Sequence, residues 1–138
     1  MEKFVLKPDN ILPGIILDPV AGKFKFYGKS CPINAHEFYI PVLEWIDNYI
    51  KNPKETTVLE FYLSYFNTVS AKNIHKIMIK IEELAKSGNR VIIRWMYNKD
   101  DEILREAGKD FEQIVEVKFE FIAITNNDET DDEESFLM

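Results

Sequence analysis

The strongest constraint on the fold is a strand, a helix and a second strand that follow one another through the middle of the chain. Residues 57–64 are rich in β-branched and aromatic side chains, which predicts a strand. Apolar residues then recur at helical spacing from about Ser70 to Ser87, and Gly88 is a natural helix end. Residues 90–97 again have the composition of a strand, so we expect a β-α-β crossover between parallel strands.

Short strands and a further helix are predicted before this unit. Apolar runs at 4–6 and 15–17 lie between turns, and residues 23–27 alternate like a strand with one solvated face, closed by Gly28. In the next segment Asn34 and Glu37 have capping-box spacing at the start of an apolar helical stripe. Pro41 lies inside that stripe, where it should kink the helix or make it start late.

A third helix and a last strand complete the pattern. Residues 98–102 open the helix with acids in its first turn, where the helix dipole favours them, and the helix ends near Phe111. Residues 115–121 then alternate between apolar and charged types, a half-buried edge pattern. The sequence therefore predicts an α/β fold in which a mixed sheet packs against helices.

Charge divides the chain into two regions. The formal net charge is -7, yet six acids lie within residues 125–138, which contain no Lys or Arg. Removing these six from 24 acids leaves 18 against 17 bases, so the remainder is nearly neutral. We expect a single domain over residues 1–124 and an acidic, disordered tail over 125–138. Because no basic stripe is present, nucleic-acid binding is not expected.

The chain shows few features of a membrane protein or an enzyme. No apolar run approaches the ~20 residues that span a bilayer, and the lone Cys31 suggests a reducing, cytoplasmic setting. His36 and His75 have no metal-ligand spacing, and no phosphate loop or nucleophile motif is present. Asp100-Asp101-Glu102 leaves open a small metal-dependent enzyme, although the helix dipole explains these acids without a metal. No cofactor or metal is therefore expected.

Two arginines are a further candidate. Arg90 and Arg94 fall on one face of a strand, where they could bind a phosphate or a carboxylate. An ion pair with Glu60 on the neighbouring strand is the simpler expectation. Trp45 and Trp95 are expected in or beside the core.

Polar residues fill the junction between the first central strand and its helix. Hydroxyls at Thr68 and Ser70 would lie beside the positive end of the helix dipole and its unpaired N–H groups. This position can hold a phosphate, and a phosphate there can act as a switch. Asn, Thr and Ser are also favoured helix caps, so simple capping remains an alternative.

Three ordered segments together resemble the SiaC family of bacterial regulatory phosphoproteins. The first runs from Glu60 through Tyr65-Phe66-Asn67-Thr68 to Lys72, and the second covers Glu37 to Trp45. The third leads from Trp95-Met96-Tyr97 through Asp100-Asp101 to residues 106–111, and residues 117–121 also fit. The similarity extends from about Gly28 to Ile124.

The resemblance implies a fold like the STAS domains of anti-sigma-factor antagonists and a role in partner switching. It implies phosphorylation of Thr68 by a dedicated serine/threonine kinase, reversal by a PP2C-type phosphatase, and binding of a downstream target by the unmodified form. A diguanylate cyclase is the target in the best-known branch, which promotes biofilm formation. Val69 and Ala71 replace serines that are frequent in the family, and the acidic tail lies outside the pattern.

The expected partner interface follows from this resemblance. It comprises Tyr65, Phe66, Asn67, Thr68, Ser70 and Lys72, with Thr68 as the modified residue, Lys72 as a candidate phosphate partner and Ser70 as a possible second acceptor. The alternative is a constitutive anti-sigma-factor antagonist or scaffold of the same fold, in which Thr68 only caps a helix. Neither alternative requires the chain to be an enzyme.

Overall fold

Residues 1–125, the part of the chain that the computed structural model describes, form one six-stranded sheet and three helices. In chain order the elements are β1 (Phe4–Leu6), β2 (Gly14–Asp18), β3 (Lys23–Ser30), α1 (Ala35–Ile50), β4 (Thr56–Phe66), α2 (Thr68–Lys86), β5 (Arg90–Asn98), α3 (Glu102–Ile114) and β6 (Lys118–Ile124). The predicted α/β class, with a mixed sheet packed against helices, is confirmed. Apart from Thr125, the predicted acidic tail lies outside the described residues.

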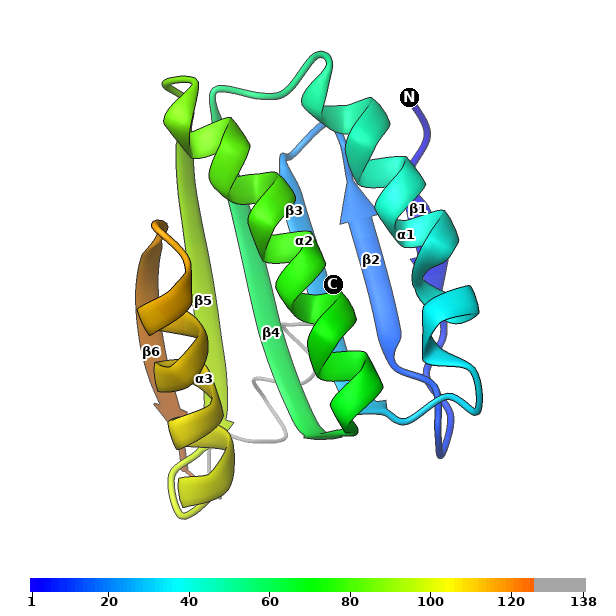
Figure 1. Cartoon of the computed structure of the whole chain (residues 1–138), viewed down its shortest axis with the longest axis vertical. Coiled ribbons are helices and arrows are strands. Elements are labelled where there is room, and N and C mark those ends of the chain that lie inside the picture. The colour runs from blue at the N-terminus through cyan, green and yellow to red at the C-terminus, as the bar shows by residue number, and fades with distance from the viewer. Residues whose placement is uncertain (126–138) are drawn as a thin grey trace.

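The strands lie in the sheet in the order in which they occur in the chain. β1 and β2 pair antiparallel, as do β2 and β3, whereas β3, β4, β5 and β6 form parallel pairs. Crossovers between parallel strands are nearly always right-handed, so three crossovers stepping in one direction place their helices on one face. All three helices therefore cover the same face of the sheet (Figure 1).

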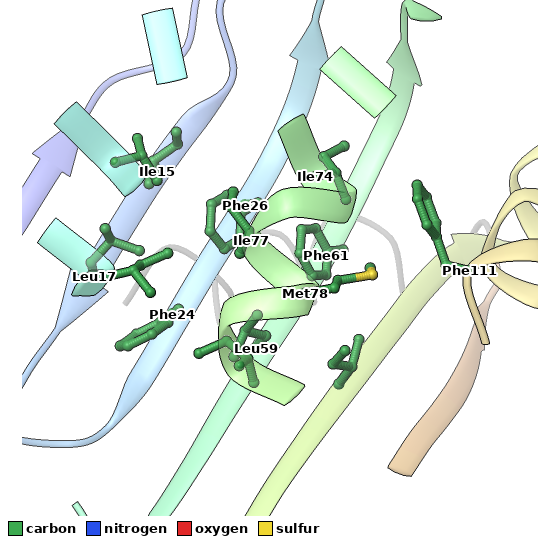
Figure 2. Packing of buried hydrophobic residues seen from close by; sticks show 14 of the residues in the cluster. Ile15, Leu17, Phe24, Phe26, Leu59, Phe61, Ile74, Ile77, Met78 and Phe111 are labelled. Carbon is green, nitrogen blue, oxygen red and sulfur yellow. The ribbon is translucent and has the colours of Figure 1, made fainter. Parts of the chain in front are cut away.

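The hydrophobic core lies between this helical layer and the sheet. Figure 2 shows side chains of α2, among them Ile74, Ile77 and Met78, over apolar residues of the strands. Phe26 and Phe61 stack on neighbouring strands with ring centroids 4.7 Å apart. Trp95 is buried, and Trp45 is half-buried against Phe24, so the expected placement of both tryptophans is confirmed.

The end of β3 and the start of α1 differ from the prediction. β3 does not close at Gly28 but continues to Ser30, because a bulge between Gly28 and Lys29 uses the positive φ of +85° that glycine adopts readily. α1 does not start late, since it begins at Ala35 and contains Pro41. The Asn34 cap accepts a hydrogen bond from the Glu37 N–H at 3.2 Å and fixes this early start.

No helix among residues 1–125 is long and apolar enough to cross a bilayer.

Close contact with Trp95 fixes α3 against the sheet. A methyl group on Gly108 would collide with the indole ring, whose Nε1 donates a 2.8 Å hydrogen bond to the Leu104 carbonyl. We expect Gly108→Ala to lower the free energy of unfolding, because overpacking costs about 1–3 kcal/mol and exceeds the gain in helix propensity of up to about 1 kcal/mol. Urea unfolding followed by tryptophan fluorescence measures the change.

The control for this substitution is Gln113→Ala on the exposed side of the same helix, which should change stability by less than about 0.5 kcal/mol. A Gly108→Ala variant as stable as the wild type would contradict the packing argument.

Candidate functional site

The junction between β4 and α2 is organised by Asn67. This residue is the N-cap of α2, and its Oδ1 accepts a 2.8 Å hydrogen bond from the Ser70 N–H. Its own N–H donates to the Ser30 carbonyl at 3.1 Å, which ties the junction to the end of β3. The helix thus starts at Thr68, two residues before the predicted start, and its cap is not Thr68.

Thr68 occupies the first position of α2 and is exposed. Within residues 1–125 its hydroxyl makes no hydrogen bond, because Asn67 already supplies the cap. Lys72 is also exposed and follows one turn later on the same side of the helix. The junction therefore presents a free hydroxyl, a nearby cation and the first N–H groups of a helix.

A cluster of buried hydroxyls lies beneath Thr68. Ser30 Oγ donates a 2.9 Å hydrogen bond to Ser70 Oγ and shares a 2.7 Å hydrogen bond with the Tyr39 hydroxyl. Burial raises the pKa of Tyr39 to about 12, so this phenol stays neutral at physiological pH. Because Ser70 is 0% exposed, it serves to position the junction and does not itself lie on the surface.

Phe66 anchors the same junction from the side of β5. Its ring meets Trp95 edge-on at a centroid distance of 6.2 Å and contacts Phe111 of α3 at the same distance. On the other side, Asn73 Nδ2 donates to the Val69 carbonyl at 2.9 Å and lies 3.2 Å from His36 Nδ1 of α1. Contacts with β3, β5 and all three helices thus hold the backbone around Thr68 in place.

The electrostatics of the three helix starts differ. Glu37 lies in the first turn of α1 and Glu102 in that of α3, whereas the first turn of α2 contains no acidic residue. Acids near a helix N-terminus offset its partial positive charge, which is equivalent to about half an elementary charge. The start of α2 therefore retains a positive potential beside the Thr68 hydroxyl.

Exposed apolar side chains lie at the same edge of the sheet as Thr68, where β3, β4 and β5 end and all three helices begin (Figure 1). We call this the switch edge. Tyr65 is 51% exposed there, and Ile33 before α1 and Ile103 in α3 are 97% and 81% exposed. Isolated exposed apolar residues are ordinary, but several at one edge suit a protein interface.

The other candidate sites have structural explanations. Asp101 caps α3 by accepting a 3.0 Å hydrogen bond from the Leu104 N–H, and Glu102 pairs with Arg105 at 3.8 Å. Both acids, with Asp100, line a pocket of 560 Å³, yet residues 1–125 contain no group of three His, Cys, Asp or Glu able to hold a metal. Arg94 pairs with Glu60 at 3.2 Å, which confirms the simpler expectation for that arginine.

The structure brings most of the predicted site residues together but gives them different positions. Tyr65, Thr68 and Lys72 are exposed, Asn67 and Phe66 are half-buried, and Ser70 is enclosed. Sequence reasoning did not single out Ile33 and Ile103, because their position at the same edge as Thr68 depends on the pairing of parallel strands. An apolar residue directly before the Asn34 cap was the available signal, although such residues often pack onto their own helix.

Comparison with known proteins identifies the family to which the chain is similar. A sequence model of the family described as SiaC family regulatory phosphoprotein matches residues 6–124. An uncharacterised protein of Pseudomonas aeruginosa strain UCBPP-PA14 is 31% identical over 101 residues, which are 73% of this chain and 80% of that protein.

Solved structures show the same relationship. Apo-SiaC from Pseudomonas aeruginosa superposes with a TM-score of 0.82 at 27% identity, covering 89% of this chain and 100% of that one. The matching chain in the complex of the diguanylate cyclase SiaD with its activator SiaC, from the same organism, superposes with a TM-score of 0.83 at 26% identity. The match covers 88% of this chain and 99% of that one. The chain therefore belongs to the SiaC family of regulatory phosphoproteins and shares its STAS-like fold.

Proposed function

We propose that this protein is a non-enzymatic partner switch in the cytoplasm, controlled by reversible phosphorylation of Thr68. A dedicated serine/threonine kinase adds the phosphate and a PP2C-type phosphatase removes it. The unmodified form binds and activates a downstream target, a diguanylate cyclase, and so acts in cyclic di-GMP and biofilm control. The free, exposed Thr68 hydroxyl at the start of α2 is the observation that carries this proposal.

Phosphorylation changes this site in two opposite ways. A phosphate adds roughly -1.5 to -2 charges, which the acid-free start of α2 and Lys72 stabilise in the free protein. The same charge, placed within an interface that accommodates a neutral hydroxyl, is desolvated without compensation. Losing one central contact costs about 2 kcal/mol, or about thirtyfold in affinity, which is enough to release a target.

The switch edge supplies the binding surface in this proposal. Tyr65, Ile33 and Ile103 contribute exposed apolar area around Thr68, whereas Asn67, Phe66 and Ser70 hold the backbone that presents it. The solved complex of SiaC with the diguanylate cyclase SiaD supports a diguanylate cyclase as the class of target.

Phosphate incorporation tests the acceptor residue. After incubation with ATP and a lysate of the source organism, mass spectrometry of peptides spanning Glu60 to Lys72 should place phosphate on Thr68. Ser70 should remain unmodified, because a fully buried hydroxyl is inaccessible to a kinase. Thr68→Ala is the control and should abolish incorporation in this peptide; phosphate on Ser70 would contradict the assignment.

Target binding tests the switch itself. Titration of a diguanylate cyclase in a calorimeter should give similar affinities for wild type and Thr68→Ala, and an affinity at least about thirtyfold lower for the phosphorylated protein. Gln113→Glu, an added charge on the exposed side of α3, is the matched control and should leave binding unchanged. Equal affinity of the phosphorylated and unmodified forms would exclude a switch at Thr68.

Stability measurements test the assignment of the α2 cap to Asn67, against the alternative in which Thr68 has only a capping role. Because Asn67 is the cap, Asn67→Ala should lower the free energy of unfolding by about 1 kcal/mol, and Thr68→Ala by less than about 0.5 kcal/mol. Urea unfolding of the two variants gives both values. The reverse order would restore the capping role to Thr68.

A further inference from the structure

A side-chain hydrogen bond joins the start of α1 to the first turns of α2, close to Thr68. Asn73 Nδ2 lies 3.2 Å from Nδ1 of His36, an exposed residue in the first turn of α1. The same Nδ2 donates a 2.9 Å hydrogen bond to the Val69 carbonyl, and Asn73 is only 1% exposed. We call this pair of side chains the His36–Asn73 latch.

The contact with Val69 fixes the orientation of the Asn73 amide. If the amide were turned over, its oxygen would face the Val69 carbonyl oxygen, and two acceptors would meet at hydrogen-bond distance. The group that faces His36 is therefore the amide nitrogen, which can only donate, so His36 Nδ1 must accept. Imidazole accepts at Nδ1 only when it is neutral, because both ring nitrogens of the protonated form are donors.

We propose that the His36–Asn73 latch is a pH-sensitive device, which holds the start of α1 against α2 while His36 is neutral and opens when His36 is protonated. The exposed imidazolium ring then turns toward solvent, and an N–H of the buried Asn73 amide loses its acceptor. The start of α1 separates from α2, and Ile33, directly before the Asn34 cap, changes its position at the switch edge. The device does not depend on phosphorylation of Thr68.

The surroundings of His36 offer no substitute for this hydrogen bond. The charged and titratable side chains nearest to the latch along α1, α2 and the loop before α1 are Cys31, Glu37, Lys72, His75 and Lys76. Within residues 1–125 the His36 side chain forms no ion pair, and its described polar contact is the one with Asn73. An imidazolium here also lies beside the N-termini of two helices, whose dipoles repel a cation.

The two histidines of the chain allow a matched NMR test on the whole protein. As the pH falls from about 7.5 to about 5.5, where histidine takes up a proton, the side-chain amide signals of Asn73 should shift in step with the His36 ring signals. His36→Gln, whose side-chain oxygen accepts a hydrogen bond at every pH, should abolish this shift, whereas His75→Gln should retain it. His36→Lys, which can only donate, should give the low-pH signals of Asn73 already at about pH 7.5.

A consequence for target binding rests on the proposed function. The affinity for a diguanylate cyclase, measured by calorimetry, should fall at least about fivefold between the same two pH values in wild type and His75→Gln. The fall should be smaller in His36→Gln, and equal responses of the two variants would overturn this consequence. The NMR test uses the free protein, so its result does not depend on whether a cyclase is the target.

Two results would overturn the latch itself. The first is a set of Asn73 side-chain signals that stays unchanged while the His36 ring titrates. The second is an undiminished pH response of Asn73 in His36→Gln, because another titrating group would then be responsible.

Discussion

The parallel alignment of β3, β4 and β5 is the constraint on which the rest of the structure depends. Each of these strands is followed by a helix that begins at the same edge of the sheet. The crossovers have the same handedness, and each leads to the next strand along the sheet. The starts of all three helices therefore lie along the edge that carries Thr68, and no described helix covers the opposite sheet face (Figure 1).

Residues of the β4–α2 junction other than Thr68 make the hydrogen bonds that hold it together, which leaves the Thr68 hydroxyl free and exposed. Asn67 caps the helix, and Ser70 joins Ser30 and Tyr39 in a buried hydroxyl cluster, so the rigid part of the junction lies beneath the surface. In the proposed switch, a phosphate on Thr68 would alter the charge at this end of the sheet without removing a hydrogen bond that the fold requires. The acid-free first turn of α2 would stabilise that charge in the free protein, so the energetic cost of the phosphate would arise in the complex with the target.

Much of the fold and part of the site could be predicted. Helical and alternating periodicity located every helix and the main strands, because burial of one face leaves a regular signature in the sequence. The boundary at Gly28 was wrong, because a bulge continues the strand. Of the two effects predicted for Pro41, a kink or a late helix start, the late start was wrong, because the Asn34 cap and buried side chains such as Val42 outweigh Pro41. Family resemblance, and not spacing, selected Thr68 over its neighbours.

The amino-acid sequence by itself determined the order and type of the elements and the family, and Thr68 as phosphate acceptor is an expectation that rests on that family resemblance. Only the tertiary structure decided that Asn67 is the cap, that Ser70 is enclosed, and that Ile33 and Ile103 share an edge with Thr68. The physical reason is the separation along the chain of the residues that interact. Periodicity and capping are encoded within a few residues, whereas burial and common edges depend on strand pairing between segments that are distant in the chain.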